Sequence, residues 1–355
     1  MREEQDKLSF RRNIRKGLLV TFTILGSLLM GIVALWNIEL GEESLSSLWN
    51  RSEKHAFLTA LALISCAMPC VAMRWRALLP RSSQASASPL FMTAILSSAF
   101  VLNLALPGPV GEAISAGMLS KRAKVSFADS IASLAVSRII GLASSCLLAG
   151  LMWIFAPFPT PPEWLGILGA TSGLLLSISF ITALISFFPE RPIRVVRFFL
   201  PKNQNTAADK LFTRIIEVIL EILMAIQATT KRGIKPYCYS LFWAFSGHAL
   251  VACGIAMAAQ AGGTLAPWSA VIFTYAASIA GSVVMFLFPG SAVGWDVMFG
   301  TTLSITANIS PLEAGAVTVV VRVQQMLVAI AGALALWWYG ADYIIKQDKE
   351  NSNEL

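Results

Sequence analysis

Six charged residues occur at matching intervals in two apolar parts of the chain. In each part, an acidic residue is followed 17 positions later by a second acid and 26 positions later by an arginine. The two sets are Glu112, Asp129, Arg138 and Asp296, Glu313, Arg322. Each set follows a proline–glycine break, Pro107-Gly108 or Pro289-Gly290. A guanidinium binds a phosphate through two parallel N–H donors, so the two arginines are candidate binding sites for an anionic group.

The composition of the chain places these charges in a membrane. Of its 355 residues, 56% are hydrophobic and only 13% are charged, whereas a soluble domain carries about 45–50% apolar and about 25% charged residues. A soluble enzyme is therefore excluded. The net charge of +7 indicates orientation and not nucleic-acid binding, because 23 of the 27 Lys and Arg fall in segments that we assign to one side. By the positive-inside rule that side is cytoplasmic and holds both termini.

Hydropathy predicts an all-α polytopic membrane protein with six full spans and two re-entrant hairpins. A span needs about 20 apolar residues, and the expected spans are 17–36, 55–73, 126–155, 164–188, 237–260 and 311–339. The hairpins are 89–125 and 268–310, because each apolar run stops at a proline–glycine break; irregular backbone at membrane depth is tolerated where protein shields it. We expect an amphipathic interfacial helix in the basic loop 189–236. Arg74, Trp75 and Arg76 are interpreted as an anchor that ends the second span.

The two charged sets belong to an internal repeat. Leu119-Ser120 matches Leu303-Ser304, and Ser126 matches Ser310, at the same offset as the charged residues. Residues 1–163 and 164–355 each contain three spans and one hairpin, so the second half has the opposite orientation in the membrane. Inverted repeats around broken helices are typical of transporters that work by alternating access.

The two arginines are expected near the middle of the membrane and need partners there. Arg138 lies 12 residues into its predicted span, which is about 18 Å at the rise of an α-helix. A central arginine costs roughly 2.5–3.5 kcal/mol on insertion scales. Asp129 points to the opposite helix face, so the partners are Glu112 and Asp296 at the hairpin tips, or an anionic substrate. Two other interpretations stay open: a fixed ion pair that only locks each hairpin, and acids that serve a helix start.

The remaining residues indicate no other chemistry. We expect Asp129 and Glu313 to cap helices. His55 and His248 have no Cys or carboxylate at metal-ligand spacing, and the five cysteines lie in apolar stretches. The chain has no Gly-x4-Gly-Lys-Ser/Thr phosphate loop. We therefore expect no catalytic residue, metal or cofactor.

Two segments resemble those of a known membrane family. Residues 103–112 read NLALPGPVGE and are followed by Arg138; residues 289–296 read PGSAVGWD and are followed by Arg322. The chain, from about residue 15 to 340, resembles the flippase-like membrane domain of lysylphosphatidylglycerol synthases and its stand-alone relatives. That family has an Asn…Pro…Gly-Glu segment, and later a Pro-Gly-x-Gly-x-x-Glu segment before an arginine. Here Asp296 stands where glutamate is more usual, with Trp295 before it, so the second tip is expected to fit its substrate differently.

The resemblance implies which residues contact a substrate. The candidate substrate-binding residues are Asn103, Pro107, Gly108, Gly111, Glu112 and Arg138 in the first half, and Pro289, Gly290, Gly294, Trp295, Asp296 and Arg322 in the second. Asn103 has an alternative interpretation as a polar group satisfied within the fold. Only 16 residues follow Tyr339, so the resemblance implies lipid translocation and not lipid aminoacylation.

The sequence therefore predicts a bacterial inner-membrane protein that moves an anionic or phosphate-linked lipid between leaflets. Its expected partner is the membrane lipid, with no nucleic acid; a homo-oligomer or a partnership with a lipid-synthesis enzyme stays open. Alternatives are a secondary transporter of a small anionic solute, and an accessory subunit of a lipid or cell-envelope synthesis complex that docks through loop 189–236. A transferase that uses Glu112 or Asp296 as a base is less favoured, because no nucleophile or metal cluster accompanies those acids.

Overall fold

The described part of the protein is an α-helical bundle that includes five helices long and apolar enough to cross a membrane. The computed structural model describes residues 39–40, 43–44, 53–105, 110–123, 125–156, 158–188, 190–198, 207–263, 266–285 and 291–353. Within these residues the candidate spans are Lys54–Leu78, Phe127–Phe155, Pro162–Ser186, Lys235–Ala261 and Pro311–Tyr339. They confirm five of the six predicted spans. The sixth, 17–36, lies outside the described residues.

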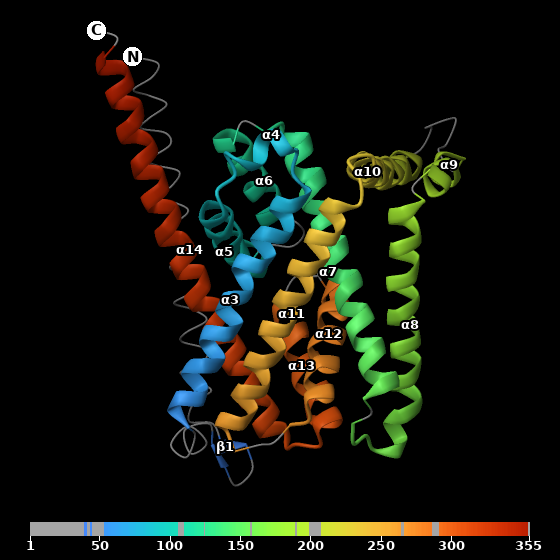
Figure 1. Cartoon of the computed structure of the whole chain (residues 1–355). Coiled ribbons are helices and arrows are strands. Elements are labelled where there is room, and N and C mark those ends of the chain that lie inside the picture. Colours follow the sequence, from blue (N-terminus) through green and yellow to red (C-terminus); the bar gives the residue numbers. More distant parts are fainter. Residues whose placement is uncertain are drawn as a thin grey trace.

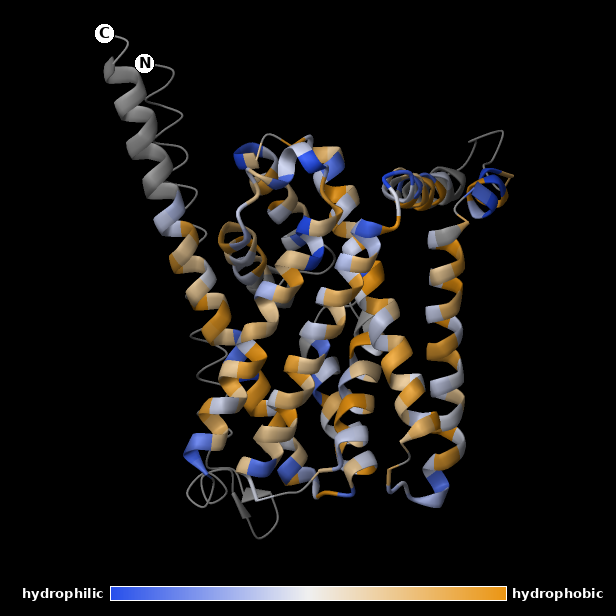
Figure 2. Ribbon diagram, in the orientation of Figure 1, coloured by the Kyte–Doolittle hydropathy of each residue, from blue (hydrophilic) through white to orange (hydrophobic). Residues whose placement is uncertain are grey.

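The five candidate spans belong to long helices that run along the bundle (Figure 1). These helices are α3 (Lys54–Leu78), α7 (Phe127–Phe155), α8 (Pro162–Phe187), α11 (Lys235–Ala261) and α14 (Pro311–Asn353). Apolar residues cover much of their length, and polar residues gather toward the two ends of the bundle (Figure 2). On α8, exposed side chains such as Leu174 and Phe180 are apolar. A helix that exposes large apolar side chains along its length is suited to contact lipid.

Two pairs of shorter helices occupy opposite ends of the bundle. α5 (Pro89–Ala105) and α6 (Val110–Ala123) pack together near one end, beside the single-turn helix α4 (Arg81–Gln84). α12 (Trp268–Met285) and α13 (Ser291–Ala307) pack together toward the other end (Figure 1). The helix bounds match the arms of the two predicted hairpins, and the breaks themselves, at Pro107-Gly108 and Pro289-Gly290, lie outside the described residues.

The predicted amphipathic segment forms two helices that lie across the end of the bundle. α9 (Glu190–Phe198) and α10 (Ala207–Thr230) run crosswise to α8 at the end where α4 lies (Figure 1). α10 buries Ile216, Leu223 and Ile226, and it packs on α7, α8 and α9. One apolar side against the bundle is the arrangement expected of a helix in the membrane interface. At the far end, β1 (Glu39–Leu40) and β2 (Glu43–Ser44) form a short antiparallel pair.

Small residues allow the central helices to approach closely. At Gly254 of α11, a Cβ atom would lie 2.9 Å from the carbonyl oxygen of Ala60 in α3, so only glycine permits this crossing. α7 buries a run of small residues, and several of them contact side chains of α3 or α11. The buried residues are Ser130, Ser133, Ser137, Gly141, Ser144 and Ser145. Membrane helices associate through such small-residue contacts, because lipid offers no hydrophobic driving force between them.

Candidate functional site

The first predicted acid–arginine pair forms between α6 and α7. Nη2 of Arg138 lies 3.0 Å from Oε1 of Glu112. Glu112 stands in the first turn of α6, directly after the break, and Arg138 is the twelfth residue of α7. The Glu112 side chain is 14% accessible, and that of Arg138 is 45% accessible. The acid is thus held inside the bundle, while the arginine remains open on one side.

The second predicted pair forms between α13 and α14. Nε of Arg322 donates to Oδ1 of Asp296 over 2.6 Å, and its Nη1 donates to Oε1 of Gln325 over the same distance. The guanidinium carbon lies 5.1 Å from the centre of the Trp295 ring, and Trp295 stacks on Phe299. Arg322 is also the twelfth residue of its helix, but its side chain is only 13% accessible.

The two pairs are equivalent by sequence offset but differ in openness. Position 112 corresponds to 296, and 138 to 322, at an offset of 184. Arg322 is more enclosed than Arg138, because it stacks on Trp295 and donates a hydrogen bond to Gln325. A guanidinium whose N–H groups are not all used can donate hydrogen bonds to a further anion. In a guanidinium with several partners, these N–H groups are already in use.

Ser126 and Ser310 cap the helices that carry the arginines, and the second acids, Asp129 and Glu313, bond to these serines. Ser126 Oγ accepts a hydrogen bond from the backbone N–H of Asp129 and donates to the Asp129 carboxylate. Ser310 and Glu313 repeat this arrangement at the start of α14. These bonds satisfy backbone donors that the first turn of a helix leaves open. Asp129 and Glu313 therefore lie away from the arginines and position the helices.

The sequence of this chain matches one known family over most of its length. Residues 22–332 match the family described as the lysylphosphatidylglycerol synthase TM region. The chain belongs to this family. No curated protein and no solved structure matches it.

Several candidate residues of this family member fall at the edges of the described structure. Pro107, Gly108, Pro289 and Gly290 lie outside the described residues. Asn103 lies in α5 and Gly294 in α13, but the structure describes only the helices at these two positions and not how far the residues are buried. Gly111 is buried in the first turn of α6, next to Glu112. Among the described residues, no group of three or more His, Cys, Asp or Glu could hold a metal ion.

The interpretation of Arg74 and Trp75 as a membrane-edge anchor is wrong. α3 continues to Leu78, and both side chains turn inward: Arg74 is 6% exposed and Trp75 is fully buried. Trp75 donates from Nε1 to Ser133 Oγ over 3.0 Å, and Arg74 donates from Nε to Ser137 Oγ over 3.1 Å. The polar, small-residue face of α7 receives these two side chains, which hydropathy alone cannot show.

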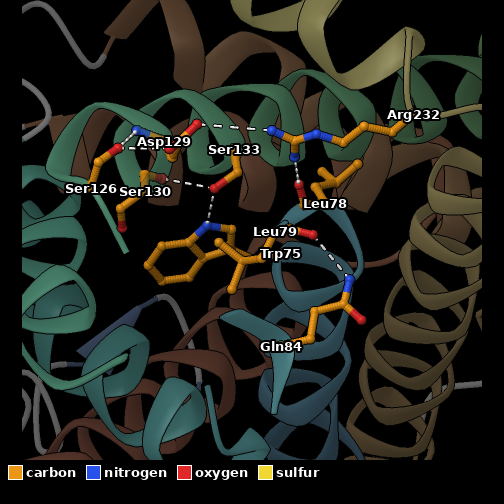
Figure 3. A network of polar contacts seen from close by, with 9 residues as sticks. All are labelled: Trp75, Leu78, Leu79, Gln84, Ser126, Asp129, Ser130, Ser133 and Arg232. Carbon is orange, nitrogen blue, oxygen red and sulfur yellow. Dashed lines mark hydrogen bonds and ion pairs between the residues drawn. The ribbon is translucent and has the colours of Figure 1, made fainter. Parts of the chain in front are cut away.

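A network of polar contacts holds the end of α3 against the start of α7 (Figure 3). Arg232, in the turn before α11, donates to the carbonyl oxygen of Leu78 over 3.0 Å and lies 3.8 Å from the Asp129 carboxylate. Gln84 donates to the carbonyl oxygen of Leu79. Together with the bond from Trp75 to Ser133, these contacts fix how far α3 reaches along α7.

His248, which sequence reasoning left without a partner, joins a buried polar cluster between α7, α11 and α12. Its Nε2 lies 2.9 Å from Ser144 Oγ and 3.2 Å from the carbonyl oxygen of Gly141, and its Nδ1 lies 3.2 Å from the Tyr275 hydroxyl. The partners come from distant parts of the chain, so no local motif signals the cluster. Because both ring nitrogens already have partners, His248 is a structural hydrogen-bonding group rather than a metal ligand.

Proposed function

We propose that this chain is a lipid translocase that moves an anionic or phosphate-linked lipid between the leaflets of the bacterial inner membrane. The observation that carries the proposal is the pair of intramembrane contacts, Arg138 with Glu112 and Arg322 with Asp296. Arginines inside membrane helices are costly and mark substrate or ion pathways. In this proposal the arginines bind the head-group phosphate, the carboxylates hold them between transport cycles, and no covalent chemistry takes place.

The packing of the helices supports an inverted-repeat architecture for this transporter. In the proposed repeat α3 corresponds to α11, α5 to α12, α6 to α13 and α7 to α14. α5 packs on α14, α12 packs on α7, and α3 packs on α11. If each helix is replaced by its counterpart, the α5–α14 contact becomes the α12–α7 contact, and the α3–α11 contact stays the same. The α5–α6 and α12–α13 pairs approach from opposite ends (Figure 1), as two re-entrant hairpins of opposite orientation would.

The unequal openness of the two pairs supports alternating access. Arg138 is 45% accessible and Arg322 is 13% accessible, so the end of the bundle that carries α6 presents the more open guanidinium. The basic segments flank this end, which places it on the cytoplasmic side in our proposal. A head group would then meet Arg138 first and pass to Arg322 when the hairpins move.

A translocation assay with matched variants tests the function. The protein is reconstituted in vesicles that contain fluorescent phosphatidylglycerol, and a membrane-impermeant quencher reports how fast the lipid changes leaflet. We expect Arg138→Ala and Arg322→Ala each to abolish the protein-dependent rate. Arg191→Ala removes the same charge from α9, away from both pairs, and should leave the rate unchanged.

Lipid retention gives a second readout that does not depend on turnover. Mass spectrometry of the gently purified protein should find a phosphate-bearing lipid enriched in the wild type and lost from the Arg138→Ala/Arg322→Ala double variant. Equal retention of bulk phospholipid, together with an unchanged translocation rate, would overturn the proposal. It would favour the transport of a small anionic solute, or the role of accessory subunit.

A further inference from the structure

Arg74 is a buried cation that pairs with none of the carboxylates in the described part of the chain. It is 6% exposed, and within the described part of the chain its one hydrogen bond runs from Nε to Ser137 Oγ. Its two terminal nitrogens, Nη1 and Nη2, make no hydrogen bond to the described residues, and none of the described carboxylates forms an ion pair with it. Burying an unpaired charge is strongly unfavourable, so the position needs an explanation beyond packing.

The backbone of α7 is shaped to accept the Arg74 guanidinium. A Cβ atom at Gly141 would overlap this group, so the guanidinium rests directly on the helix backbone where glycine leaves room. Ser137 lies one helical turn before Gly141 and accepts the Nε bond. At about 1.5 Å per residue, Ser137 lies roughly 15 Å from the start of α7, well inside the span. The Trp75–Ser133 bond shown in Figure 3 fixes α3 in this register.

The surroundings of Arg74 carry an excess of positive charge. Arg138 is the residue that follows Ser137 in α7, so the helix turn that accepts the bond from Arg74 also carries a second arginine. Glu112 pairs with Arg138 and is the acid that this region supplies among the described residues. Glu112 therefore neutralises Arg138, while Arg74 has no carboxylate partner among the described residues, which leaves a net charge of about +1 beside the neutral groups of His248 and Tyr275.

The second half of the protein does not reproduce this excess. At the offset of 184, Ser137 corresponds to Val321, and Gly141 corresponds to Gln325. Gln325 accepts a hydrogen bond from Arg322, whose charge is matched by Asp296. The space that Arg74 occupies in the first half thus has no equivalent on α14. Among the described residues, the charge excess therefore lies in the first half of the chain.

We propose that Arg74 is a substrate-binding residue that, together with Arg138, receives the phosphate of the transported molecule. The inference rests on the proposed function and adds a residue to its site. A phosphodiester carries one negative charge, which neutralises the excess, and its oxygens suit the paired donors of two guanidinium groups. A lipid head group and inorganic phosphate share this chemistry. The binding step is noncovalent.

Thermal unfolding of the full chain in phosphatidylcholine nanodiscs tests the role of Arg74. The protein is measured with no additive, with phosphatidylglycerol in the nanodisc, and with inorganic phosphate in solution. We expect one of the two probes to raise the Tm of the wild type, because a ligand that binds only the folded state stabilises it. A rise with phosphatidylglycerol identifies a lipid head group as the ligand, and a rise with phosphate alone identifies a small anion.

The variant Arg74→Met separates binding from packing because it keeps the bulk and removes the charge. We expect its Tm without additive to equal or exceed that of the wild type, since an unpaired buried charge is gone, and we expect the anion-dependent rise to disappear. Arg76→Met is the matched control. Arg76 donates to the carbonyl oxygens of Ala87 and Gln84, so its loss should lower the Tm but keep the anion-dependent rise.

A second variant covers the case in which Arg74→Met does not fold. Arg74→Lys keeps the charge but not the two-pronged donor, and it should bind phosphatidylglycerol about tenfold more weakly in a nanodisc titration. A wild type without an anion-dependent rise, or an Arg74 variant that keeps the full rise or affinity, would overturn the inference. Because binding is measured without translocation, loss of this site and failure of the proposed transport are distinguishable.

Discussion

Ser120 Oγ donates a 2.7 Å hydrogen bond to the carbonyl oxygen of Val125, across the turn that joins α6 to α7. The same bond, with the same length, joins Ser304 to Ile309 in the turn between α13 and α14. Both residues of the second bond lie 184 positions after those of the first. The repeat seen in the spacing of charged residues therefore extends to single hydrogen bonds in the turns that position them.

Removing either serine should weaken the corresponding turn by the same amount. We expect Ser120→Ala and Ser304→Ala each to lower the free energy of unfolding by about 1 kcal/mol, and the double variant to show the sum, because the turns share no partner. Chemical unfolding monitored by tryptophan fluorescence measures the effect. Ser186→Ala is the control, since its hydroxyl bonds only within α8. A loss in one turn but not in the other would show that the two turns differ in energy despite their geometry.

The hydrogen bond between Trp75 and Ser133 should contribute more to the free energy of unfolding than its 3.0 Å length suggests. Ser133→Ala leaves the buried indole N–H without an acceptor, and we expect a loss of about 1–3 kcal/mol in the free energy of unfolding. Trp75→Phe removes the donor as well. The double variant should therefore be less destabilised than the sum of the single variants, as a double-mutant cycle would report. Additive effects would mean that the indole finds another acceptor.

The two acids should respond differently to neutralisation because their arginines differ in exposure. Asp296→Asn leaves the mostly buried Arg322 charge without its carboxylate, and we expect a loss on the order of 3 kcal/mol in the free energy of unfolding. Glu112→Gln leaves Arg138, whose side chain is less enclosed by the protein at 45% accessible, and should cost about 1 kcal/mol. Comparing the Tm values of the two variants checks the order. Equal losses would argue against the difference in enclosure.

Cysteine labelling should place the two helix pairs on opposite sides of the membrane. In a background without the five native cysteines, single cysteines at Ser88 and Ser126 should react with an impermeant reagent from the cytoplasmic side only. Cysteines at Pro267 and Ser310 should react from the outer side only. These residues flank the helix pairs, so the pattern tests both the re-entrant hairpins and the opposite orientation of the halves. Any other pattern contradicts the inverted repeat.

The sequence predicts the partners that charged and polar groups need when they are removed from water. An arginine in the middle of an apolar helix needs a partner, so the pairing of Arg138 and Arg322 with the acids after the two breaks follows from composition and spacing. The positions of Asp129 and Glu313 at helix starts follow for a similar reason, because a helix start needs acceptors. The predicted ends of five spans also agree with the ends of the candidate spans to within five residues, since length and hydropathy determine them.

The buried polar groups could not be predicted because their environment is made by other helices. Arg74 directly follows the predicted span 55–73, where an arginine ordinarily extends to the membrane surface. Its inward position depends on Ser137 and Gly141, which lie more than 60 residues away. His248 likewise depends on Ser144 and Tyr275. In a single sequence, these residues look like ordinary small or aromatic packing groups.

The exchange of packing partners between the two halves has a mechanical consequence. Glu112 at the tip of α6 holds Arg138, but the neighbouring α5 packs on α14, which carries Arg322; likewise α12 packs on α7, which carries Arg138. A displacement of α5 therefore pushes on α14, and a displacement of α12 pushes on α7. Two sites coupled in this way influence each other by the same factor in both directions. In the proposed transporter, occupancy of one arginine would thus be communicated to the other through the helix backbones, with no need for the ligand to reach both.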